Sequence, residues 1–205
     1  MELVNLSFDQ YLTKTDLIDF SFPLIVDACQ KIQANTKTEN EIIQKIFEYV
    51  RDEINHSNDI NEQGITCTAS EVILNKHGIC CAKANLLCAM LRFFKIPVGF
   101  CYQKLKSNTR NCFVLHGLNA VYLRDKNVWI RLDARGNNKI LKTDFSLDHD
   151  VFVYQIDESI GEQNHPDIFP EPNNVVIEIL KKVKSRTELW EYWDNGLKSV
   201  FNKTN

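Results

Sequence analysis

Apolar residues recur at helical spacing in the first third of the chain. Ile42, Ile46 and Val50 lie four positions apart, and Thr38 with Glu41 before them has the spacing of a capping box. This pattern predicts an amphipathic helix that starts after Thr38 and runs to about residue 54. The same reasoning predicts helices at 23–35 and 70–74, with a polar, irregular loop at 55–68.

A second helical pattern begins near Cys80 and continues to about Phe94. Ala84 and Leu87 mark an apolar stripe, but the other faces are apolar as well. A helix that is apolar almost all round is a buried one. We therefore expect this helix to run through the centre of the molecule, and Pro97 to end the turn after it.

The next third of the chain is rich in β-forming residues. Strands are predicted at 98–104, 112–123, 128–135 and 151–155, and helices at 174–184 and 190–201. Helices grouped first and strands second favour an α+β fold with an antiparallel sheet. The chain of 205 residues suits one sizeable core, so we predict a single domain over 1–205, with its core at about 40–140 and a C-terminal helical extension at about 170–205.

The second and third predicted strands form a hairpin with its turn at 124–127. Side chains alternate between the two faces of a strand, and pairing Tyr122 with Trp129 gathers the apolar residues on one face. In that register His116 and Asp133 are diagonal neighbours on the other face, about 5–8 Å apart at Cβ. A shift by two residues makes them direct neighbours, whereas a one-residue slip splits the apolar set. The hairpin therefore predicts a His–Asp pair.

Charge and composition limit the partners that suit the chain. Its 24 Lys and Arg against 27 Asp and Glu give a formal net charge of -3, which argues against a dedicated nucleic-acid binder. No apolar run reaches the ~18 residues of a membrane span, and the N-terminus lacks the pattern of a signal peptide. Seven cysteines at irregular spacing then indicate free thiols, and we predict a cytoplasmic protein that binds neither nucleic acid nor membrane.

Two adjacent cysteines follow Gly78 in the segment GICCAKA at 78–84. Cys80 stands where the predicted helix begins, and the exposed N–H groups and dipole of a helix start favour a thiolate. Cys81 is the rival nucleophile, although one step along a helix turns its side chain about 100° away. A thiol with a His–Asp pair is the set that nucleophilic acyl transfer needs. The thiolate attacks a carbonyl carbon, the imidazole moves the proton, and the carboxylate orients the imidazole.

The motifs together resemble the transglutaminase-like family of cysteine enzymes. The similarity begins with GICCAKA and continues through LLCAMLR at 86–92 and IPVG at 96–99. Further along, HGLNAVYL at 116–123 is similar to the family's histidine strand, and VWIRLDARGN at 128–137 is similar to its aspartate strand. The resemblance covers about 42–137 and implies a papain-like core in which the catalytic helix packs on an antiparallel sheet. It implies Cys80 as nucleophile, His116 as base and Asp133 as orienting acid.

The resemblance has departures, at Lys95, Leu118 and Ala120, which leave the three catalytic candidates intact but bear on the substrate. We predict thiol-dependent acyl transfer on an amide bond through a thioester, with hydrolysis of a peptide, protein or small amide as the favoured reaction. Three alternatives stay open: a protein-glutamine transglutaminase, an arylamine acyltransferase, and a catalytically silent binding module on the same fold. His56 is a further candidate for the lining of the site.

We expect no cofactor and no metal. Cys80, Cys81, Cys112 and His116 include the ligand types that zinc prefers. The sequence has no CxxC pair, and Cys112 and His116, four positions apart on a strand, would lie about 13 Å from each other. Nothing in the sequence marks a calcium site.

Overall fold

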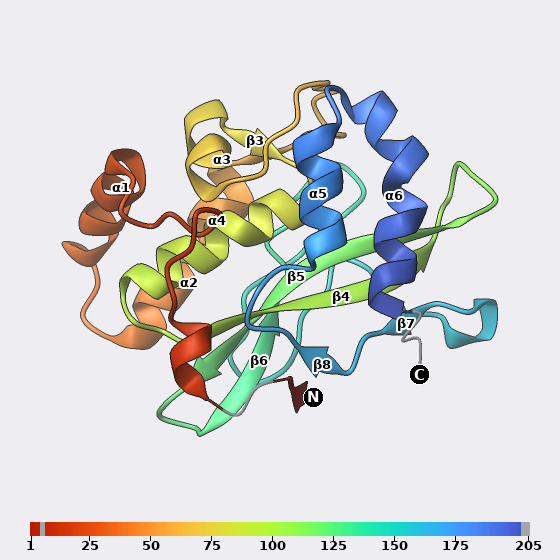
Figure 1. Ribbon diagram of the computed structural model, residues 1–205. Helices are drawn as coiled ribbons and strands as arrows, with labels where there is room; N and C mark the ends of the chain where they lie inside the picture. Colours follow the sequence, from red (N-terminus) through yellow and green to blue (C-terminus); the bar gives the residue numbers. More distant parts are fainter. Residues whose placement is uncertain (5–6, 202–205) are drawn as a thin grey trace.

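The central element of the protein is helix α4 (Cys80–Phe93). The computed structural model describes residues 1–4 and 7–201. In Figure 1, α4 lies between the other N-terminal helices and the sheet, and it contacts α1 (Pro23–Gln33), α2 (Glu39–Glu53) and α3 (Ala69–Asn75). Its residues from Cys81 to Arg92 are buried. The prediction of a buried central helix is therefore confirmed.

The main sheet is curled and antiparallel, with the strand order β6-β5-β4-β7. Its strands are β4 (Val98–Lys106), β5 (Phe113–Leu123), β6 (Val128–Leu132) and the short β7 (Gln163–Asn164). Tyr122 pairs with Trp129, as the apolar pattern predicted. One face of the β5–β6 hairpin buries Val121 and Ile130 in the core that α4 shares. The register and the α+β class are both confirmed.

The fourth strand is not where the sequence predicted it. Residues 151–155 form no strand, and Val151 makes only an isolated bridge to Leu132. Side-chain contacts hold this segment instead, since the backbone N–H of Val153 donates to the Asp133 carboxylate at 3.0 Å. The position beside β4 is taken by β7, which follows the 3₁₀ helix η2 (Glu158–Ile160). Strand β6 also ends earlier than predicted, at Leu132.

The capping prediction at the start of α2 is correct only in part. The Thr38 side chain accepts a hydrogen bond from the Glu41 N–H, but the Glu41 carboxylate binds the N–H of Lys37 instead of that of Thr38. A complete capping box occurs at the start of α3, where Thr68 and Glu71 bind each other's backbone N–H groups. Both caps satisfy N–H groups that a helix start leaves without partners.

The predicted irregular loop after α2 begins with ordered backbone. Its first residues form β2 (Asn55–His56), which pairs in parallel with β3 (His77–Gly78) immediately before α4. A second short parallel pair joins β1 (Glu2–Leu3) to β8 (Asp167–Ile168), and the 3₁₀ helix η1 (Phe8–Tyr11) lies near the N-terminus. The β2–β3 ladder matters for the site because it leads directly into Cys80.

The last two helices, α5 (Asn174–Lys182) and α6 (Arg186–Phe201), pack against each other and over the sheet (Figure 1). The Trp193 indole N–H donates to the carbonyl of Leu115 on β5 at 3.0 Å. Helix α6 begins four residues earlier than the predicted Trp190. Among the described residues, no helix is long and apolar enough to cross a membrane. The division of the chain into domains stays a prediction.

Candidate active site

Cys80 is the first residue of α4. Ile79 before it is extended, with φ -75° and ψ 169°. Close packing fixes this turn, because a Cβ on Gly78 would meet the Thr66 hydroxyl at 3.1 Å and the Ala82 Cβ at 3.2 Å. The first backbone N–H groups of a helix have no acceptor within it. The thiol therefore stands beside free donors and the positive end of the helix dipole.

His116 and Asp133 form the pair that the hairpin predicted. His116 Nε2 lies 2.9 Å from Asp133 Oδ2, and only 1% of Asp133 is exposed. The carboxylate also accepts the backbone N–H groups of Val153, at 3.0 Å, and of Arg135, at 3.2 Å. These three contacts fix the carboxylate, which in turn fixes the imidazole. Because Nε2 faces Asp133, Nδ1 is the nitrogen left for the thiol.

The Cys80 sulphur lies against β5. It hydrogen-bonds with His116 and accepts the backbone N–H of Gly117 at 3.5 Å. The approach of helix to strand is close, since a Cβ on Gly117 would lie 2.6 Å from the Cys81 Sγ. A glycine at 117 is therefore what lets the first turn of α4 reach the histidine. The structure brings Cys80, His116 and Asp133 together in one chain of contacts.

The surroundings push the pKa values of the thiol and imidazole in opposite directions. A hydrogen bond from Cys81 lowers the pKa of Cys80 most, and the charge and hydrogen bond of His116 lower it further against burial. Burial opposes the charged form of His116, but Asp133 and Cys80 raise its pKa to about 10. The two groups therefore favour a thiolate–imidazolium pair.

The rival Cys81 has a different environment. Its side chain is buried, and the hydrogen bond with Cys80, together with burial, raises its pKa well above the ordinary value. Burial likewise raises the pKa of Cys88 and of Cys101 to about 11. Cys112 is exposed. A thiolate at neutral pH is thus favoured at Cys80 and disfavoured at its neighbour.

A second histidine, His56 of β2, also reaches the Cys80 sulphur through a hydrogen bond. Burial lowers the pKa of His56 most, and the nearby Arg135 lowers it further. From the sequence, His56 was only a candidate for the lining of the site. The strand that positions it, β2, has two residues, which is too few to show the alternation of a strand.

Sequence reasoning missed the group above His116. The ring of Tyr154 meets that imidazole edge-on, with centroids 5.0 Å apart. Tyr154 also hydrogen-bonds with Arg135, whose guanidinium forms an ion pair with Asp59 at 2.7 and 2.9 Å. No local signal in the sequence indicates the contact of Tyr154 with His116, because Tyr154 lies in the segment 151–155 that was wrongly predicted as a strand, far along the chain from His116.

Lys83, one turn into α4, links this helix to the end of α2. It is buried, and burial lowers its pKa to about 7. Its amine donates to the carbonyl oxygens of Ile54 and, at 3.5 Å, of Arg51, at the end of α2. Lys83 therefore connects helix α4 to the residues that lead into β2.

A cavity of about 460 Å³ opens at Cys80 and His116. Its lining includes Lys106 at the end of β4, Arg110 in the loop that follows, and the aromatic side chains of Tyr154 and Trp190. The Arg110 guanidinium lies over the Trp190 ring, 4.8 Å from its centre. Cationic and aromatic side chains therefore meet in the lining of the cavity that leads to the thiol.

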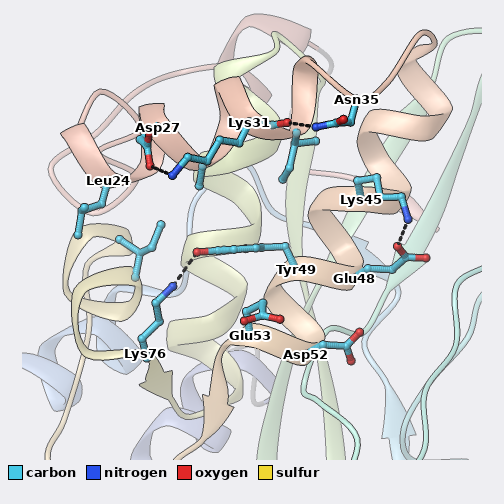
Figure 2. A pocket seen from close by; sticks show the side chains of 13 residues that line it. Leu24, Asp27, Lys31, Asn35, Lys45, Glu48, Tyr49, Asp52, Glu53 and Lys76 are labelled. Atoms are coloured by element: carbon cyan, nitrogen blue, oxygen red, sulfur yellow. Dashed lines mark hydrogen bonds and ion pairs between the residues drawn. The ribbon is translucent and has the colours of Figure 1, made fainter.

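A separate hollow of about 560 Å³ lies between α1, α2 and α3. Figure 2 shows Lys31 paired with Asp27, Lys45 with Glu48, and Lys76 with the Tyr49 hydroxyl. Its lining holds no cysteine or histidine. Within the described part of the chain, no group of three or more His, Cys, Asp or Glu side chains could hold a metal ion. Of these two cavities, the one at Cys80 therefore combines a thiol with histidines.

Comparisons with known proteins identify the family and the fold of the chain. Residues 26–134, more than half of the chain, match the family model described as the transglutaminase-like superfamily. A crystal structure from Cytophaga hutchinsonii, provisionally described as a cysteine protease, is 16% identical with a TM-score of 0.51; the match covers 64% of this chain and 43% of that one. A provisionally described protease from Parabacteroides distasonis is 14% identical with a TM-score of 0.40, over 61% and 25% of the two chains. This chain thus spans less than half of either structure. No curated protein matches it.

Proposed function

The chain belongs to the transglutaminase-like superfamily, and from this premise we propose that it is a thiol enzyme that hydrolyses an amide bond through a thioester, with Cys80, His116 and Asp133 as its catalytic residues. The observation that carries the proposal is the chain of contacts in which His116 binds the Cys80 sulphur on one side and Asp133 on the other. Its substrate is a peptide, a protein or a small amide.

The geometry supports the following sequence of steps. The Cys80 thiolate attacks the amide carbonyl, a C–S bond forms, and the carbonyl electron pair moves to oxygen. When that pair returns, the C–N bond breaks and the imidazolium of His116 gives its proton to the leaving amine. Neutral His116 then takes a proton from water, which attacks the thioester and releases the acid and the thiolate. Asp133 stabilises the charged imidazole throughout.

A pH series of alkylation tests the proposal. With its lowered pKa, Cys80 keeps its thiolate as the pH falls through neutrality, so iodoacetamide should label it rapidly below pH ~7. Exposed Cys112 is the reference thiol in the same molecule. Mass-spectrometric mapping gives both rates, and His116→Ala should slow the labelling of Cys80, because the pKa of Cys80 rises when the charge and hydrogen bond of His116 are lost.

Two results would contradict the proposal. An ordinary thiol, of pKa ~8.5, is mostly protonated at pH ~6 to ~7. If Cys80 labels no faster than Cys112 in that range, the thiolate–imidazolium pair is absent. If Cys81 labels first, the nucleophile is wrongly assigned. Either result favours the alternative of a silent binding module that uses the same cavity.

The two cationic side chains in the cavity lining favour water over an amine as acceptor. Lys106 and Arg110 line the route to Cys80, and they repel the ammonium form in which most amines exist at neutral pH. We therefore expect glycine ethyl ester to divert little of the acyl group from hydrolysis. The Lys106→Glu and Arg110→Glu double variant should raise the share of amide product, measured by mass spectrometry. If wild type already gives mostly amide product, the enzyme is a transglutaminase.

A further inference from the structure

The Cys80 sulphur is contacted by two imidazoles that arrive from different elements. His116 comes from β5, and His56 from the short strand β2. The chemistry proposed above uses only His116. His56 is 7% exposed, lines the same cavity and hydrogen-bonds with the sulphur. A buried imidazole in contact with a reacting atom requires a physical account.

The backbone fixes which nitrogen of His56 faces the thiol. His56 pairs with Gly78, and the Ser57 N–H donates to the Gly78 carbonyl at 3.1 Å. The Asn58 N–H donates to His56 Nδ1 at 3.3 Å. A neutral imidazole whose Nδ1 accepts a hydrogen bond carries its proton on Nε2. The Cys80 contact of His56 is therefore made by an N–H donor.

Burial keeps His56 in this neutral form, because it lowers the pKa of the imidazole most. Arg135 is the cation that faces it, while Asp59, which also faces it, is paired with that same guanidinium. Cys80 is the remaining group in contact. The two imidazoles therefore differ: His116 lies beside the Asp133 carboxylate and favours a proton on each nitrogen, whereas His56 keeps one N–H and cannot act as the acid.

We propose that His56 is a catalytic residue whose Nε2–H, with the backbone N–H of Cys80, stabilises the oxyanion of the tetrahedral intermediate. The inference deepens the proposed amide hydrolysis and rests on it. During attack the negative charge moves from sulphur to an oxygen two bonds away. A donor that already contacts the sulphur can follow the charge to that oxygen, and the Cys80 N–H at the helix start is a second donor in the same residue as the sulphur. No proton leaves His56 in this step.

The test separates attack on a carbonyl from alkylation. Acylation by p-nitrophenyl acetate creates an oxyanion, whereas displacement of iodide from iodoacetamide creates none. Both rate constants are measured for wild type, His56→Phe and His56→Gln, at a pH where the 240 nm absorbance shows a complete thiolate in each protein. Gln places an N–H near the position of Nε2, and Phe fills the space without a donor. His77→Gln, on the paired strand β3, is the matched control.

We expect His56→Phe to lower the acylation rate constant by about 10²- to 10³-fold, the usual effect of losing one oxyanion donor, while alkylation keeps its wild-type rate. His56→Gln should recover most of the acylation, and His77→Gln should match wild type in both. Equal losses in the two reactions, or no loss of acylation in His56→Phe, overturn the inference. If wild-type Cys80 is not alkylated faster than Cys112, the proposed function fails as well, and the alkylation arm shows this independently of any oxyanion.

Discussion

Replacing Cys80 with alanine is expected to reduce acyl-transfer turnover by on the order of 10⁶-fold, the loss seen when a catalytic nucleophile is removed. No other described thiol stands at a helix start beside a histidine: Cys81 is buried with a raised pKa, and Cys112 is exposed away from the pair. The measurement is release of p-nitrophenol from p-nitrophenyl acetate in a single turnover. Thermal unfolding of the same sample shows whether the fold is kept.

Cys81→Ser is the matched control for this prediction. It changes the neighbouring thiol but keeps a hydrogen-bond donor toward Cys80, which is the contact that lowers the pKa of Cys80 most. Turnover should remain close to wild type, with at most a shift of the acidic limb to higher pH. If Cys80→Ala stays active while Cys81→Ser is inactive, the two cysteines have exchanged roles and the catalytic assignment is wrong.

Replacing Asp133 with asparagine is expected to lower turnover by about 10⁴-fold, as loss of the orienting carboxylate does in other triads. The amide offers an N–H to His116 Nε2, which would move the imidazole proton to Nδ1, where it can no longer accept the proton of the thiol. The charge that holds the pKa of His116 at about 10 also disappears. Turnover needs the imidazolium, so the basic limb of the pH profile, near pH 10 in wild type, should move toward the ordinary histidine value of ~6.5.

Kinetics across the pH range separate this effect from general damage to the fold. Asp27→Asn removes a carboxylate from an exposed ion pair with Lys31 in the separate hollow, and should leave the profile unchanged. Asp133→Asn should lower the maximum turnover and also move the basic limb of the pH profile to lower pH. If Asp133→Asn lowers the maximum turnover but keeps its basic limb near pH 10, Asp133 does not raise the pKa of His116.

Local patterns in the sequence determined the long elements and the key register. The apolar residues of the hairpin fit one face only when Tyr122 opposes Trp129, and that register brings His116 to Asp133 without further information. The all-round apolar character of 80–93 likewise fixed the buried helix. Burial of apolar area selects these arrangements, because a slip by one residue would expose the whole set.

Short and non-local features were decided by the tertiary structure. Residues 151–155 have a strand pattern, yet β7 takes the place at β4, and Val153 is held by the Asp133 carboxylate. Strand β2 has two residues, too few for periodicity, so only its pairing with β3 carries His56 to the thiol. The sequence by itself therefore determined the buried helix that begins at Cys80 and the His–Asp pair. The tertiary structure decided the environment of the thiol, because that environment comes from chain segments that meet only when the core has formed.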